Sequence, residues 1–221
     1  VVESFILIKV INQKPLEILQ IPTELAVAIP GETNIQPLSA TYNKGGVALS
    51  ADAINEITRI RKGASQRFVV IPRNVLGMIV DDIGDIKIEL NKPLKVKNNT
   101  EDDTLDLSAG LQRINGSQVI RFLAYRKNKH DYVESRKRRR SVIKGLFLQM
   151  NYPENISKIP SLTKKIFKEV ETDLTQKEII SLFIAALSSG KEPIIQKLPL
   201  NPPSENTFLR QIKRNQAKAL W

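Results

Sequence analysis

Basic side chains are concentrated between residues 126 and 140, and this concentration could bind an anion. Eight of these fifteen residues are Lys or Arg, against the two acids Asp131 and Glu134. Guanidinium groups stay charged at physiological pH and bind phosphate oxygens through paired hydrogen bonds. The anion could be a lipid pyrophosphate or a nucleic acid, and the alternative is a cationic surface that faces only solvent. The arginines that could bind it are Arg126, Arg136, Arg138 and Arg139.

A helix is predicted directly after this stretch, and it must position most of the arginines. Val142, Ile143, Leu146, Phe147 and Met150 recur at helical spacing, which is typical of a helix packed on a core. The arginines then fall near the start of the helix, where the helix dipole disfavours cations. A cluster in that place costs stability unless an anion or acidic groups lie beside it. The pattern therefore favours an anion site over a surface that is only solvated.

Other residues with chemical potential give weaker signals. His130 is the single histidine, and no Ser or Cys partner for it is evident in the sequence. Arg73 lies between a predicted strand and a predicted helix and is interpreted as surface charge. Asp81 and Asp82 fall in the last turn of that helix and are interpreted as a solvated face. No glycine-rich phosphate loop is present, because the chain contains neither GxGxxG nor GxxxxGK[ST].

Composition narrows the class of protein. The 221 residues suffice for one large domain or two small ones, and 41% hydrophobic with 26% charged residues is typical of a globular chain. A formal net charge of +11 favours polyanionic partners. The absence of cysteine excludes disulfides and thiolate catalysis. The longest apolar runs fall well short of the roughly 20 residues that a bilayer-spanning helix needs.

Strands and helices alternate along the chain, as in an α/β protein. β-prone runs predict strands over residues 4–11, 16–21, 25–29, 67–71 and 86–90. Helical spacing and end signals predict helices over residues 45–63, 74–84 and 175–190. A polar excursion is expected over residues 91–103. This order predicts helices on both faces of a central mixed sheet.

Five segments in order resemble the LytR–CpsA–Psr family. They are residues 21–31 (IPTELAVAIPG), 40–46 (ATYNKGG), 67–94, 105–126 and 170–179 (VETDLTQKEI). The resemblance implies a three-layer α/β/α fold with a central mixed sheet, as a single domain over residues 1–221. It also implies an extracytoplasmic protein whose membrane anchor, with a first strand or acidic motif, lies upstream of Val1.

The resemblance implies a function as well. Family members transfer glycopolymers from polyprenyl-pyrophosphate carriers to peptidoglycan or another cell-wall acceptor, and they were once described as transcriptional attenuators. Arginines bind the phosphates, and carboxylates hold a Mg²⁺ ion that neutralises the leaving pyrophosphate. The expected partners are thus a polyprenyl (pyro)phosphate-linked glycan, a wall acceptor and the membrane.

The family's acidic motifs match this chain only in part. Glu3 and Glu24 stand where the family has metal-binding aspartates, so they are the predicted Mg²⁺ ligands. Thr23 stands where the family has a phosphate-binding arginine. An ordinary carboxylate at a strand end is the alternative interpretation of both glutamates.

The arginine motif also matches in part. Arg126 retains the second arginine of the family's Tyr-x-Arg-x-Arg pattern. The final basic pair falls on Arg138 and Arg139, and a one-residue slip places Arg136 where Ser135 otherwise stands. The predicted catalytic residues are Arg126 and Arg138, and the predicted substrate-binding residues are Arg126, Arg136, Arg138 and Arg139.

Three functions follow as hypotheses. The first is a Mg²⁺-dependent phosphotransferase of this family, with reduced activity because several site residues differ. The second is a non-catalytic module that binds a lipid phosphate or a wall polyanion. The third is a nucleic-acid-binding regulator, which ranks last because only charge supports it and no helix-turn-helix, zinc-finger or aromatic platform is evident.

Overall fold

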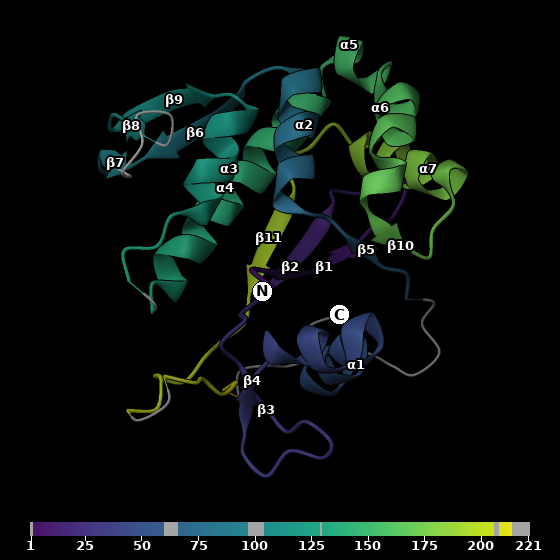
Figure 1. The fold of residues 1–221 in the computed structure, drawn as a ribbon. Helices are drawn as coiled ribbons and strands as arrows, with labels where there is room; N and C mark the ends of the chain where they lie inside the picture. The colour runs from purple at the N-terminus through teal and green to yellow at the C-terminus, as the bar shows by residue number, and fades with distance from the viewer. Residues whose placement is uncertain (1, 60–65, 97–103, 129, 206–207, 214–221) are drawn as a thin grey trace. The chain divides into compact units, whose positions relative to one another are not determined.

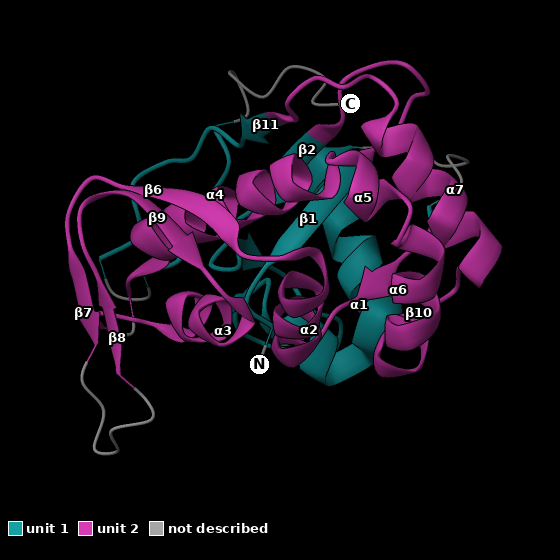
Figure 2. Ribbon diagram, turned by 90° about the horizontal axis from the view of Figure 1, so that it is seen from above, with its two compact units in different colours: residues 1–8, 18–66, 195–221 teal, residues 9–17, 67–194 magenta. Residues whose placement is uncertain are grey.

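The computed structural model describes residues 2–59, 66–96, 104–128, 130–205 and 208–213 (Figure 1). The chain forms two compact units, each assembled from separate segments (Figure 2). Unit 1 comprises residues 1–8, 18–66 and 195–221, and unit 2 comprises residues 9–17 and 67–194.

Unit 1 contains a three-stranded sheet in which β2 (Glu17–Ile21) lies between β1 (Phe5–Lys9) and β11 (Ile194–Lys197). Four of the five residues of β2 are buried, because apolar side chains occupy most of the strand. A short antiparallel pair follows, formed by β3 (Ala26–Val27) and β4 (Gln36–Pro37). The core of unit 1 joins this region to α1 (Ala40–Thr58).

Helix α1 is kinked at Gly45 and Gly46, which both leave helical geometry. Gly46 has a φ of 61°, in the left-handed region that glycine adopts without a steric penalty. The sequence predicts a helix that begins at this pair, whereas the structure extends it back to Ala40. Thr41 supports the added turn, since its hydroxyl donates to the Leu38 carbonyl at 2.8 Å.

Unit 2 is mostly helical, with short antiparallel strand pairs. Its helices are α2 (Arg73–Ile83), α3 (Gly116–Ala124), α4 (Tyr132–Met150), α5 (Pro153–Ile156), α6 (Ile159–Ile166), the 3₁₀ turn η2 (Phe167–Glu169) and α7 (Gln176–Leu187). Its strand pairs are β5 (Val69–Val70) with β10 (Glu171–Thr172), β6 (Ile86–Leu90) with β9 (Gly110–Ile114), and β7 (Leu94–Val96) with β8 (Leu105–Leu107).

Helices α2 and α3 approach each other through two glycines (Figure 1). A Cβ atom on Gly77 would lie 2.6 Å from Cδ1 of Ile120, and one on Gly116 would collide with the carbonyl oxygen of Gly77. Asp81 of α2 accepts a hydrogen bond of 2.9 Å from the backbone N–H of Gly116. This contact fixes how the two helices run past each other.

Replacing Gly116 with Ala is expected to lower the free energy of unfolding by about 1–3 kcal/mol, since an added methyl group in a packed contact forces the backbone apart. The melting temperature should fall by roughly 5 °C for a chain of this size. Ser117→Ala, on the exposed neighbouring residue, is the control and should change it little. Equal melting temperatures for the two variants would show that the helix contact is loose.

The α/β class predicted from the sequence is confirmed, because helices combine with a mixed sheet. The capping box of Thr175 and Glu178 starts α7 as expected, and α2 lies within one residue of its predicted range. The excursion at 91–103 instead contains β7, whose alternating Leu94 and Val96 pair with β8. The stacking of three layers stays a prediction. Within the described residues, no helix combines the length and apolar character needed to span a bilayer.

Candidate anion-binding site

The predicted arginines lie on helix α4 of unit 2 and on the loop that joins α3 to α4. Helix α3 begins at a capping box in which Asn115 and Gln118 bond each other's backbone, and it ends just before Arg126. Helix α4 carries the other arginines in its first half. Its second half packs on β6 without a side chain between them, because a Cβ atom on Gly145 would lie 2.7 Å from the Lys87 carbonyl oxygen. The arginines therefore stand on anchored elements.

Arg138 forms a buried clamp on the loop between α3 and α4. Its Nη2 donates to the Tyr125 carbonyl at 2.7 Å and to Asp131 Oδ2 at 3.0 Å. The side chains of Arg138 and Asp131 are only 10% and 8% exposed. Asp131 Oδ2 also accepts from the Lys127 backbone N–H at 3.1 Å, so one carboxylate oxygen joins the loop to the helix. Arg138 is thus a positioning residue as well as a predicted catalytic one.

Two nitrogens of Arg138 take no part in the clamp. Its Nε is buried without a hydrogen-bond partner among the described residues, and the hydrogen bonds that the structure gives Arg138 all come from Nη2 and not from Nη1. Its guanidinium carbon also lies 5.0 Å from the centroid of the Tyr125 ring, a cation–π distance. The prediction that Arg138 binds a phosphate is therefore confined to the nitrogens that lie outside the clamp.

Arg139 is the most unusual residue of the cluster. The residue is 8% exposed, and within the described part of the chain its Nη2 has no hydrogen-bond partner. Burial is the largest cause that lowers the pKa of Arg139 to about 9, and the positive charges of other arginines, Arg126 first, contribute to the same shift. A buried guanidinium surrounded by like charges is costly unless an anion lies against it.

Arg126 faces solvent beside this buried arginine. It is exposed, and among the described residues it makes no hydrogen bond or ion pair. Partial burial and the charge of Arg138 lower the pKa of Arg126, and the charge of Asp131 opposes that effect. Arg126 is therefore placed to bind a ligand that approaches from solvent.

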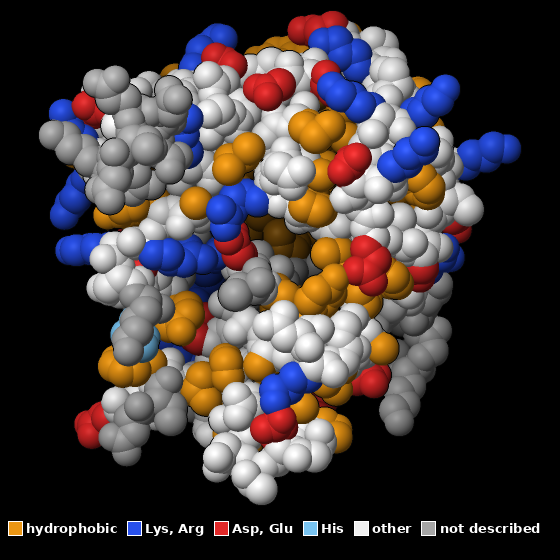
Figure 3. Space-filling view, in the orientation of Figure 1, with side chains coloured by type: hydrophobic (Ala, Val, Ile, Leu, Met, Phe, Trp, Pro, Cys, Tyr) orange, Lys and Arg blue, Asp and Glu red, His pale blue; other side chains and the backbone are white. Residues whose placement is uncertain are grey.

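Two more residues join the cluster from the remaining sequence candidates. Arg136, on α4, is half-buried, and its charge lowers the pKa values of Arg139 and Arg140. Arg73, at the start of α2, is also half-buried, and its charge reaches Arg139. The interpretation of Arg73 as plain surface charge describes only part of its surroundings, because the residue is half-buried and the charge of Arg126 acts on it. Figure 3 shows Lys and Arg side chains gathered where Figure 1 places α3 and α4.

The predicted metal ligands belong to unit 1, and the predicted arginines belong to unit 2. Glu24 is 1% exposed, and its Oε1 lies 3.9 Å from Nε of Arg210. Glu3 is half-buried before β1. Among the described residues, no three His, Cys, Asp or Glu side chains come together in a way that could hold a metal ion. A buried carboxylate that faces an arginine does not by itself fit a Mg²⁺ site, which needs several oxygen ligands.

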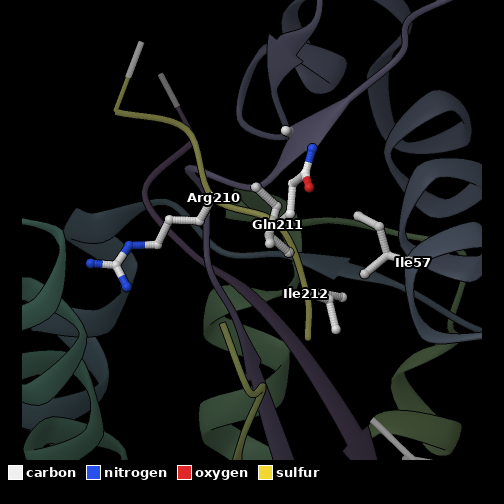
Figure 4. A pocket seen from close by; sticks show the side chains of 6 residues that line it. Ile57, Arg210, Gln211 and Ile212 are labelled. Carbon is white, nitrogen blue, oxygen red and sulfur yellow. The ribbon is translucent and has the colours of Figure 1, made fainter. Parts of the chain in front are cut away.

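A cavity of about 250 Å³ lies beside Glu24 in unit 1. Its lining residues are Leu25, Ala26, Ile57, Arg210, Gln211 and Ile212. Figure 4 shows the Arg210 guanidinium extending away from the other labelled side chains, in keeping with its pairing to Glu24. None of the predicted substrate-binding arginines lines this cavity.

Comparison with known proteins gives one family and a consistent fold. The model of the LytR_cpsA_psr family matches residues 3–219. A curated relative from Bacillus subtilis (strain 168), named polyisoprenyl-teichoic acid–peptidoglycan teichoic acid transferase TagV, is 21% identical over 175 residues. The match covers 77% of this chain and 44% of that relative, so the chain spans less than half of its length.

Solved structures share the fold at low identity. The crystal structure of B. subtilis TagV superposes with a TM-score of 0.79 and 18% identity, covering 97% of this chain and 84% of that one. A LytR-Csp2A-Psr enzyme from Actinomyces oris gives 0.75 and 16%, covering 98% and 82%. TagT bound to LI-WTA gives 0.72 and 17%, covering 97% and 80%. These likenesses show the fold.

Proposed function

Because the chain belongs to the LytR–CpsA–Psr family, we propose that it transfers a glycopolymer from a polyprenyl-pyrophosphate carrier to the cell wall. The relative TagV is named as a teichoic acid transferase that uses polyisoprenyl-teichoic acid and peptidoglycan, and TagT was solved bound to LI-WTA. The proposed partners are a lipid-linked glycan, a wall acceptor and the membrane, and the proposed place of action is outside the cytoplasmic membrane. An anchor upstream of Val1 stays a prediction.

One observation within this chain carries the proposal. Arg139 is buried, has a free Nη2 within the described residues, and is acted on by the charges of four other arginines. Those arginines are Arg126, Arg138, Arg136 and Arg73. A strongly anionic ligand would offset such a concentration of positive charge, and the diphosphate that links a polyprenyl chain to a glycan is compact enough to contact several guanidiniums at once.

The proposed phosphoryl transfer depends mainly on binding the substrate and on stabilising negative charge. It depends less on a general acid or base with a shifted pKa. Attack by an acceptor hydroxyl forms a new P–O bond, breaks the P–O–P bridge, and places negative charge on the departing polyprenyl phosphate. Arg126 and Arg139 are proposed to stabilise that charge, because their guanidiniums are the ones not committed to the loop clamp. Arg138, through Asp131, is proposed to hold Arg126 in position.

Mg²⁺ stays a proposal of the family resemblance rather than of this geometry. When bound, such an ion would neutralise the pyrophosphate. Glu3 and Glu24 are the candidate ligands, and Glu24 would first have to exchange its pairing with Arg210.

Replacing Arg126 with Ala is expected to reduce transfer from a lipid-linked oligosaccharide by about 100-fold, the effect of losing one positioned charged donor. It should also remove any polyprenyl phosphate that co-purifies with the protein, as seen by native mass spectrometry. Because Arg126 is exposed, the melting temperature should stay unchanged.

Arg113→Ala is the matched control, since Arg113 is an exposed arginine of β9 in the same unit. Its transfer rate and lipid content should equal those of the wild type. If Arg126→Ala retains the lipid and the rate, the arginine cluster is not the substrate site.

A non-catalytic binding module is the second candidate. Arg138 is committed to Asp131, and Glu24 faces Arg210, so two predicted catalytic or metal positions are engaged internally. A protein that binds lipid pyrophosphate but shows no transfer with added Mg²⁺ would support this function. Binding of DNA with a steep salt dependence, without affinity for lipid pyrophosphate, would instead indicate the nucleic-acid function.

A further inference from the structure

The packing of α2 against α3 determines where Arg73 lies. Asp81 contacts the first residue of α3, Gly116, and Gly77 contacts Gly116 and Ile120 one turn further along α3. Moving back along α2 therefore means moving forward along α3, so the two helices run antiparallel. Four residues make about one helical turn. One more turn back from Gly77 places Arg73 beside the end of α3, where Arg126 follows.

The charges of these two residues agree with that geometry. Burial lowers the pKa of Arg73 first, and the charge of Arg126 lowers it further. The charge of Arg73 also contributes to lowering the pKa of Arg139 on α4. Three arginines from three different elements thus lie near one another.

Arg73 is the first residue of α2, where the helix dipole is unfavourable for a cation. The first turn of α2 carries no acidic residue, and Pro72 supplies no side-chain cap. The buried Nη2 of Arg139, which has no partner among the described residues, points to a ligand in the same cluster.

We propose that Arg73 is a further substrate-binding residue that contacts a phosphate of the diphosphate together with Arg126 and Arg139. This inference rests on the proposed function for the identity of the ligand. Its physical basis is that three elements each bring one arginine to a common region. Arg73 is in the first turn of α2, Arg126 is in the loop after α3, and Arg139 is in the first half of α4. A diphosphate then binds through several elements, which fixes its orientation.

The test uses inorganic pyrophosphate as the probe, titrated by calorimetry into the whole chain. Arg73→Ala should weaken binding by about 10-fold or more, the usual effect of removing one charge-assisted hydrogen bond. Arg73→Lys should recover part of the affinity, because it keeps the charge without the two-pronged geometry. Arg113→Ala should change the affinity less than twofold.

The outcomes separate the two proposals. If Arg73→Ala binds pyrophosphate as tightly as Arg113→Ala does, while Arg126→Ala is weakened, the role of Arg73 is overturned and the proposed function stands. If Arg126→Ala is also unaffected, or the wild type does not bind pyrophosphate, both proposals fail. Melting temperatures of each variant without ligand exclude loss of folding as the cause, and Arg73→Lys serves if Arg73→Ala does not fold.

Discussion

Replacing Asp131 with Ala lowers the free energy of unfolding by about 3–5 kcal/mol, the cost of leaving a buried charge without its partner. Asp131 and Arg138 are nearly fully buried and 3.0 Å apart, so water cannot replace the lost carboxylate. The backbone N–H of Lys127 also loses its acceptor. The expected fall in melting temperature is on the order of 10 °C, measured by calorimetry.

A double variant separates the ion pair from general damage. Asp131→Ala combined with Arg138→Met removes both charges and should recover part of the lost stability, because no buried charge is then left alone. If Asp131→Ala alone changes the free energy of unfolding by less than about 0.5 kcal/mol, the value typical of a surface substitution, the clamp does not exist in solution.

Replacing Arg139 with Met has the opposite effect on the protein without ligand. Met fills much of the same space without a charge, so the free energy of unfolding should rise by about 1–3 kcal/mol. The same variant should lose the stabilisation that pyrophosphate gives the wild type, because the buried donor is gone. Thermal unfolding with and without pyrophosphate measures both effects.

The pKa of Arg139 gives this prediction a pH dependence. The pKa of Arg139 in the folded protein is about 9, below its ordinary value, so between these two pKa values the folded protein binds fewer protons than the unfolded chain. Stability contributed by this residue must therefore rise with pH across that window and stay constant below it. The difference between wild type and Arg139→Met should shrink from pH 9 upward.

A lower stability of Arg139→Met would contradict the interpretation that Arg139 needs a bound anion. If the guanidinium were satisfied within the protein, Arg139→Met would be less stable than the wild type at pH 7.5 without any ligand. Arg139→Lys is a useful comparison, because it keeps a charge in the same place and should not gain stability.

Local patterns in the sequence predict the elements well where end signals and periodicity agree. The capping box of Thr175 with Glu178 and the stop at Gly84 fix α7 and α2. The strand at Leu94–Val96 was not predicted from the sequence. Three residues are too few to show the alternation of a strand when lysines and asparagines surround them.

The site was predictable as a charge concentration and not as a geometry. The density of arginines marks the cluster, but the commitment of Arg138 depends on Asp131, seven residues earlier in a loop whose conformation no periodic pattern specifies. Arg73 was interpreted as surface charge because its place depends on the glycine contact between α2 and α3. Gly77 lies in a predicted helix, whereas no helix was predicted at Gly116, so this contact had no signal in the sequence.

The most direct test of the proposed arginine site is a crystal structure of the protein with bound pyrophosphate. Phosphate oxygens should lie about 2.7–3.1 Å from guanidinium nitrogens of both Arg126 and Arg139. Two results would contradict this site. Pyrophosphate could bind elsewhere on the protein, or the arginine cluster could be empty and open to solvent in crystals that contain excess pyrophosphate.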